Sequence, residues 1–64
     1  MSFEDALALA RKRAARRRED VAVVIQDATW HEYDVATEYD LETYHAGARV
    51  LAWALGDGST EVCH

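Results

Sequence analysis

Histidines and carboxylates are the residues of this chain that could carry out acid–base or metal chemistry. His31, Glu32 and Asp34 stand close together in "HEYD", and Cys63 and His64 end the sequence. A histidine beside a carboxylate can act as a general base, but no serine or cysteine has the surroundings of a nucleophile. His31 and Asp34 also fall on opposite faces of an extended segment, and their spacing matches no zinc or calcium loop. The sequence therefore predicts no enzyme, no metal site and no cofactor.

The basic residues are concentrated near the start of the chain. Six of the seven lie within residues 1–18, where only two acidic residues offset them, so this segment carries a charge of +4. These candidate phosphate-binding residues are Arg11, Lys12, Arg13, Arg16, Arg17 and Arg18. Such groups bind nucleic-acid phosphates and release counterions, although the dipole of a helix also favours cations at its C-terminus. A nucleic-acid or ribosome-associated protein is therefore an alternative function.

From residue 19 onward the sign of the charge reverses. Ten carboxylates stand against Arg49 alone, which gives this part a charge of −9 and the whole chain −5. The stretch over residues 29–47 holds five carboxylates, three tyrosines and a tryptophan, without a lysine or arginine. Aromatic residues are typical of interfaces, and spaced carboxylates attract a basic surface much as phosphates do. The candidate partner-binding residues are Glu32, Tyr33, Asp34, Glu38, Tyr39, Asp40 and Glu42.

These charges favour a non-enzymatic interaction protein that docks an acidic, aromatic face onto a basic surface of a protein partner. A nucleic-acid-handling machine that the chain inhibits would present such a surface. In size and charge, though not in matched sequence, the chain is of a class with small phage-encoded inhibitors, including anti-CRISPR proteins and DNA mimics. Two other interpretations stay open. The acids could merely solvate an outer face, or the basic helix of one copy could meet the acidic sheet of its twin in a homodimer.

The spacing of apolar residues near the start predicts a helix. Phe3, Leu7, Ala10 and Ala14 recur at helical intervals and form one apolar stripe. Ser2 can cap the first turn, because its hydroxyl can accept a hydrogen bond from a free amide.

Alternating and β-branched residues predict strands over 21–27, about 31–36, 48–55 and, as a fourth, 59–62. Thr37 can cap a short helix over 38–46, and Gly47 can end it. An alternative joins residues 38–55 into one long helix, with a glycine in its interior and Trp53 off its apolar stripe.

Together these elements predict a single α+β domain over residues 1–64. The N-terminal helix should pack on a small antiparallel sheet of three or four strands, with a short helix before the third strand. By alternation, the stripe of the helix is expected to meet Val21, Val23, Ile25, Leu51, Trp53 and Leu55. Twelve alanines add little buried area, so bulky side chains are expected to supply most of the core.

The sequence also bears on location. No apolar run approaches the roughly 18 residues of a membrane span, and the first residues are charged where a signal peptide would be apolar. Cys63 is the only cysteine, so no disulfide can form within the chain. A cytoplasmic chain without a membrane partner is expected.

Overall fold

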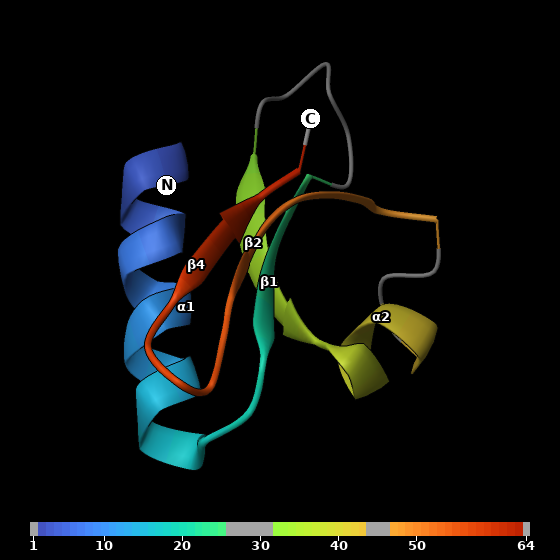
Figure 1. Cartoon of the computed structure of the whole chain (residues 1–64). Helices are drawn as coiled ribbons and strands as arrows, with labels where there is room; N and C mark the ends of the chain where they lie inside the picture. Colours follow the sequence, from blue (N-terminus) through green and yellow to red (C-terminus); the bar gives the residue numbers. More distant parts are fainter. Residues whose placement is uncertain (1, 26–31, 44–46, 64) are drawn as a thin grey trace.

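The computed structural model describes residues 2–25, 32–43 and 47–63 (Figure 1). The elements in chain order are α1 (Phe3–Arg17), β1 (Val21–Ile25), β2 (Tyr33–Thr37), α2 (Glu38–Thr43), β3 (Arg49–Ala54) and β4 (Thr60–Val62). The strands form one antiparallel sheet in the order β2-β1-β3-β4. The predicted α+β architecture is confirmed, including the short helix before the third strand. No helix within the described ranges is long and apolar enough to cross a membrane.

Local hydrogen bonds close both ends of α1. The Ser2 hydroxyl accepts a hydrogen bond from the Asp5 amide at 3.2 Å, which confirms the predicted cap. At the other end, Arg18 is left-handed (φ 54°, ψ 43°) and its amide donates to the Ala14 carbonyl. Glycine is the usual residue at such a position, because a Cβ is strained there. Gly56 packs against this end, since a Cβ added to it would lie 2.8 Å from the carbonyl carbon of Arg18.

The core consists of small side chains. The buried apolar residues in the described part of the chain are seven alanines and four valines. Ala6, Ala10 and Ala14 are fully buried between α1 and the sheet, whereas Phe3 and Leu7 are half-buried beside them. Larger side chains pack at the margin of this core, and Leu9, Tyr33, Leu41 and Trp53 are among those that are partly buried there. A helix that faces a sheet with alanines leaves no room for larger groups at native packing density.

The residues that the sheet turns toward α1 differ in part from the predicted ones. On β1, Val21 and Val23 lie in the core beneath the helix, as predicted. On β3 the prediction is wrong, because Ala52 and Ala54 lie beneath the helix and Trp53 packs on the opposite face. The prediction also placed Ile25, Leu51 and Leu55 beneath the helix, but these residues belong to neither buried cluster.

A β-bulge accompanies this reversal. Val23 pairs with Ala52 but Val24 pairs with Val50, so Leu51 is an extra residue on β3. An extra residue changes which side chains of a strand share a face. Val50 therefore shares the face of Trp53 and not that of Ala52 and Ala54. The two alanines lie beneath the helix because they pair with Val23 and Val21.

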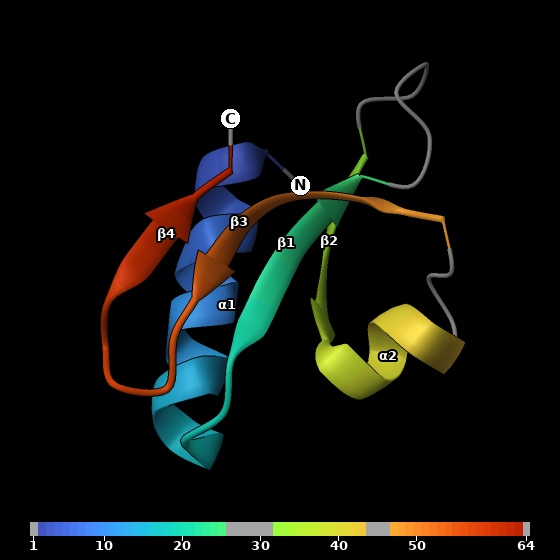
Figure 2. The same ribbon diagram turned by 45° about the vertical axis from the view of Figure 1, so that its right-hand side comes forward.

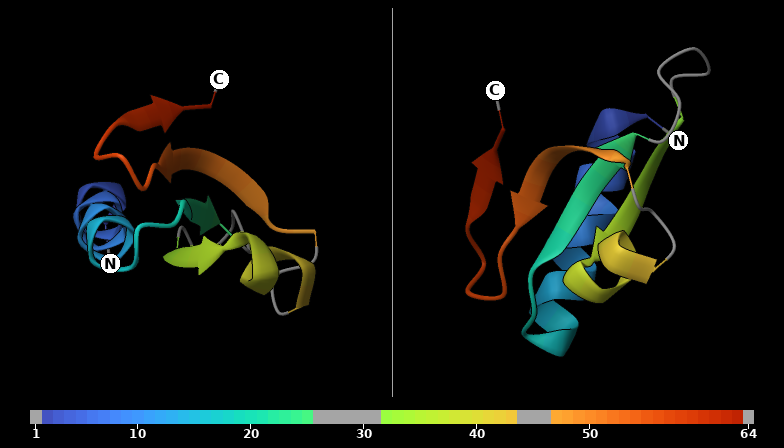
Figure 3. Two further views of the ribbon diagram at one scale, coloured as in Figure 1. Left: turned by 60° about the horizontal axis from the view of Figure 1, so that its bottom comes forward. Right: turned by 90° about the vertical axis from the view of Figure 1, so that its right-hand side faces the viewer.

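The second helix covers part of the other face of the sheet. Ala22, Val24 and Ala36 form a second buried cluster, and Leu41 of α2 and Trp53 pack against it. In the right-hand view of Figure 3, α1 lies behind the strands and α2 in front of them, and Figure 2 shows the same separation. The sheet thus lies between the two helices.

The described residues decide two questions that the sequence left open, the long helix and the fourth strand. The long helix over 38–55 is wrong, because α2 ends at Thr43 and β3 begins at Arg49, with Gly47 left-handed (φ 86°) before it. The fourth strand is confirmed as β4. Other predicted ends fall within 26–31 and 44–46, which lie outside the described residues.

A turn joins β3 to β4. The Ser59 hydroxyl and amide donate to the Asp57 carboxylate at 2.6 and 2.9 Å, and these hydrogen bonds lower the pKa of Asp57. Gly58 is left-handed at φ 97°. An aspartate that accepts a hydrogen bond from the backbone amide two residues later in the sequence is typical of turns.

Candidate functional site

The sheet divides the charged residues between its two sides. All six predicted phosphate-binding residues are exposed: Arg11, Lys12, Arg13, Arg16 and Arg17 on α1, and Arg18 directly after it. On β2, Tyr33 and Val35 face α1, and Ala36 faces the other way. Asp34 alternates with its neighbours and therefore shares the side of Ala36 and α2. The strand β2 has a basic helix on one side and an acidic helix on the other.

Tyr33 does not share a surface with the acidic residues. Its ring packs edge-on against Phe3, with 5.8 Å between ring centroids and 70° between planes. It is half-buried on the α1 side of the sheet. Of the two tyrosines predicted to bind a partner, only Tyr39 lies among exposed carboxylates.

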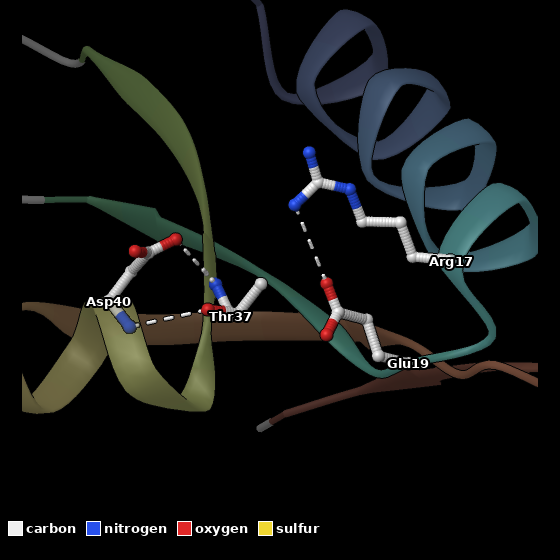
Figure 4. A network of polar contacts seen from close by, with 4 residues as sticks. All are labelled: Arg17, Glu19, Thr37 and Asp40. Carbon is white, nitrogen blue, oxygen red and sulfur yellow. Dashed lines mark hydrogen bonds and ion pairs between the residues drawn. The ribbon is translucent and has the colours of Figure 1, made fainter.

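Thr37 and Asp40 form a reciprocal cap at the start of α2. The Asp40 amide donates to the Thr37 hydroxyl and the Thr37 amide donates to the Asp40 carboxylate, each at 3.2 Å (Figure 4). This is the arrangement of a capping box, with aspartate in the place of the usual glutamate. The predicted cap is confirmed, and it gives Asp40 a structural task besides any role in binding.

The rest of α2 presents an acidic surface to solvent. Glu38 and Glu42 are exposed and lie one helical turn apart, and Tyr39 between them is 68% exposed. Like charges at this spacing disfavour a helix, and no basic residue stands in the last turn to offset the dipole. Within the described ranges, no arginine or lysine pairs with either glutamate. We call Glu38, Tyr39 and Glu42 the acidic surface of α2.

Carboxylates also cover backbone amides along β2. The Val35 amide donates to Asp34 at 2.8 Å, and the Thr37 amide donates to Asp40. These two amides are two residues apart, so they point to the same side of the strand. Both amides donate to side chains, and β2 pairs with β1 alone among the described strands, so we infer that this side is its outer edge. Side-chain carboxylates thus occupy donors that an edge strand would otherwise offer to another chain.

A groove of about 370 Å³ runs beside this edge. Its basic wall consists of Arg13, Arg16 and Arg17 from α1. Val35 and Ala36, which face opposite sides of the sheet, both line it, so the groove follows the edge of β2. The remaining lining residues are Glu19, Val21, Thr37 and Asp40. A smaller hollow of about 270 Å³ adjoins it and is lined by Glu19, Asp20, Thr37, Glu38 and Tyr39.

One ion pair joins charged residues of the described segments. The Arg17 guanidinium lies 3.9 Å from the Glu19 carboxylate, and the two side chains are 71% and 43% exposed (Figure 4). An exposed pair of this kind contributes at most about 1 kcal/mol. The arginines of α1 therefore do not neutralise the acidic surface of α2, which lies across the sheet.

The groove was not foreseen from the sequence, although its charged residues were. Arg13, Arg16 and Arg17 stood out as part of the basic cluster, and Asp40 as part of the acidic one. Their meeting at the edge of β2 depends on how α1 crosses the sheet. Three others, Arg11, Lys12 and Arg18, do not line the groove, so the basic cluster divides into two parts.

Other predicted features lie outside these surfaces. Glu32 is exposed directly before β2. His31, His45 and His64, which could act as bases, fall outside the described residues. In the ranges that are described, no three histidine, cysteine or carboxylate side chains gather as metal ligands would.

Comparison of the chain with protein-family models, with curated proteins and with solved structures gave no match. Proposals about function therefore rest on the residues and geometry of this chain.

Proposed function

We propose that this chain is a non-enzymatic interaction protein that docks the acidic surface of α2 onto a basic surface of a protein partner. The observation that supports this most is the exposure of Tyr39, at 68%, between Glu38 and Glu42. An exposed tyrosine supplies much contact area at a low cost in conformational entropy. Carboxylates around it would draw a basic partner in and set its orientation.

The energetics of α2 support the same proposal. Glu38 and Glu42 repel each other, and Glu42 stands at the end of the helix where negative charge is unfavourable. A basic partner would relieve both effects, so α2 would gain stability on binding. Surfaces that bind are often less stable than they could be, because the residues needed for binding are not those best for folding.

We propose further that the partner is a nucleic-acid-handling protein of the cytoplasm, which the chain inhibits. A basic groove that holds phosphates is also a groove that carboxylates can occupy. Purified chain should then displace a labelled oligonucleotide from the partner, and this displacement should weaken as salt rises. Displacement that is insensitive to salt would contradict occupation of the groove by charge.

The test of docking compares two double variants with equal change in charge. Glu38→Gln with Glu42→Gln alters the acidic surface, whereas Glu4→Gln with Glu61→Gln alters exposed carboxylates on α1 and β4. Asp40 is left unchanged because it caps α2. We expect the first variant to lose partner capture and the second to retain it, with the partner identified by mass spectrometry. Equal capture of the partner by both variants would exclude the acidic surface of α2 as the docking site.

A second candidate function is phosphate binding by the arginines of α1. It is favoured by the three guanidinium groups that line one groove, and opposed by the two carboxylates, Glu19 and Asp40, in the same lining. Changing Arg16, Arg17 and Arg18 to glutamine should abolish retention of nucleic acid and flatten its dependence on salt. Retention that survives these changes would exclude this candidate.

A structural homodimer remains a third proposal, since opposite charges lie on opposite sides of one small body. Light scattering at low and high salt would detect it, because an assembly held by exposed charges weakens as salt screens them. A monomer under both conditions would contradict it.

A further inference from the structure

We propose that the groove beside β2 binds an extended segment of a partner protein as an added strand, whose side chains are alternately acidic and basic. This inference rests on the proposed function in assuming a protein partner, and it states how that partner is held. It follows from three features of the groove: an edge of β2 that no other described strand pairs with, the arginines of α1 beside it, and the Asp40 carboxylate at its end.

The edge itself supplies the main-chain contacts. Among the described strands β2 is paired on one side only, with Tyr33–Thr37 forming the ladder to β1. An extended peptide beside such an edge continues the sheet by backbone hydrogen bonds. The groove touches Val35, Ala36 and Thr37, so a strand lying in it would run along this edge.

The charges beside the edge determine which side chains fit. Successive residues of an added strand point alternately to the two faces of the sheet. Side chains on the α1 face meet Arg13, Arg16 and Arg17, which favour carboxylates although Glu19 already pairs with Arg17. Side chains on the α2 face meet Asp40, whose carboxylate favours lysine or arginine. A strand with alternating charge satisfies both faces at once, whereas a uniformly charged chain such as nucleic acid is repelled from one of them.

The carboxylates also act as a selective barrier. In the free protein, Asp34 and Asp40 accept hydrogen bonds from the Val35 and Thr37 amides. A strand that pairs with these amides must displace both carboxylates, which costs charge-assisted hydrogen bonds. Basic side chains on the incoming strand would compensate, because they offer the displaced carboxylates new partners. A strand without basic side chains cannot offset this cost, so the carboxylates exclude it and give the edge specificity.

A second copy of this chain fits the groove poorly. Its own β2 has the sequence "YDVAT", with no basic residue to receive the displaced carboxylates. Two-fold pairing of two β2 strands must also be antiparallel to satisfy the ladder, which places both basic helices on the same face of the joined sheet. The charges therefore favour a different protein as the occupant.

A synthetic peptide of about six residues, a typical strand length, tests the proposal when it alternates glutamate with lysine. Added to the whole chain, it should shift the NMR signals of the Val35 and Thr37 amides and slow their hydrogen exchange. A peptide of equal composition with its glutamates and lysines in separate blocks should do neither. An alternating peptide that is N-methylated at every second residue, on the strand edge that faces β2, should likewise cause neither the shift nor the slower exchange. Equal binding of either control, or no shift at millimolar alternating peptide, would overturn the proposal.

Matched variants test the arginine wall. Arg13→Glu with Arg16→Glu should weaken binding of the alternating peptide about five- to tenfold. Arg11→Glu with Lys12→Glu makes the same change in charge outside the groove and should leave binding nearly unchanged; an equal loss in both would overturn the proposal. These measurements need no natural partner. A negative result with the peptides is therefore distinguishable from a negative result in the partner-capture test of the acidic surface of α2.

Discussion

Thr37 and Asp40 exchange two hydrogen bonds of 3.2 Å where β2 ends and α2 begins. The pair caps the acidic helix and covers an amide of the edge strand with the same carboxylate. One local motif thus links the two surfaces for which binding is proposed.

Removing this cap should lower stability. Thr37→Ala takes away the hydroxyl that accepts from the Asp40 amide, and we expect a loss of about 1 kcal/mol in the free energy of unfolding. Urea denaturation followed by circular dichroism measures this loss. Thr43→Ala, at the exposed end of α2, is the control and should change stability little. Equal effects of the two variants would contradict the cap.

The alanine face of α1 should reject larger side chains. Ala14 is fully buried against the sheet, whereas its neighbour Ala15 is exposed. Ala14→Leu should lower the free energy of unfolding by about 1–3 kcal/mol through overpacking, and Ala15→Leu should be nearly neutral. Thermal denaturation compares the two variants. A tolerated Ala14→Leu would mean that α1 packs more loosely than the structure shows.

Glycine should be preferred where α1 ends. Arg18 is left-handed, a conformation that strains any residue with a Cβ, so Arg18→Gly should stabilise the protein by about 1 kcal/mol. Arg16→Gly makes the same change within the helix and should destabilise it by about 1 kcal/mol. Changes of opposite sign in the free energy of unfolding, measured by chemical denaturation, would confirm the conformation of Arg18. A loss of stability in both variants would refute it.

Charge reversal at the two ends of α2 should have unequal effects on stability. Glu42→Lys replaces a repulsive pair with an attractive one and puts a cation at the helix C-terminus, so we expect a gain of about 0.5 kcal/mol. Glu38→Lys changes the net charge equally but puts the cation at the N-terminus, and it should give no gain. Under the proposed function both variants lose partner capture. A gain from Glu38→Lys as large as that from Glu42→Lys would contradict the dipole explanation.

The turn at Asp57 should respond to pH. Hydrogen bonds from Ser59 lower the pKa of Asp57 in the folded chain, so their contribution is present above the pKa of the unfolded state, about 3.9. It is lost as the pH falls through the folded pKa. Ser59→Ala should raise the pKa of Asp57 toward the ordinary value in an NMR titration of the carboxyl carbon. An unchanged titration would contradict the hydrogen bonds.

Local sequence was sufficient for the type and order of most elements, whereas residues 38–55 stayed open between a short helix with a strand and one long helix. Ser2 and Thr37 cap helices because a hydroxyl next to free amides acts within a few residues. The strands were recognised from β-branched and alternating side chains, and Gly47 separates α2 from β3 because glycine accepts a left-handed backbone. The division of charge between the first helix and the later segments is likewise a property of the sequence alone.

Only the tertiary structure decided which faces meet and which charges lie together. The register of β3 on β1 pairs Ala52 and Ala54 with Val23 and Val21 beneath the helix, so Trp53 packs on the opposite face. The packing of α1 on the sheet brings Arg13, Arg16 and Arg17 to the edge of β2, where they line one groove with Asp40. These relations depend on the distance at which α1 crosses the sheet, which the volumes of side chains far apart in the sequence determine together.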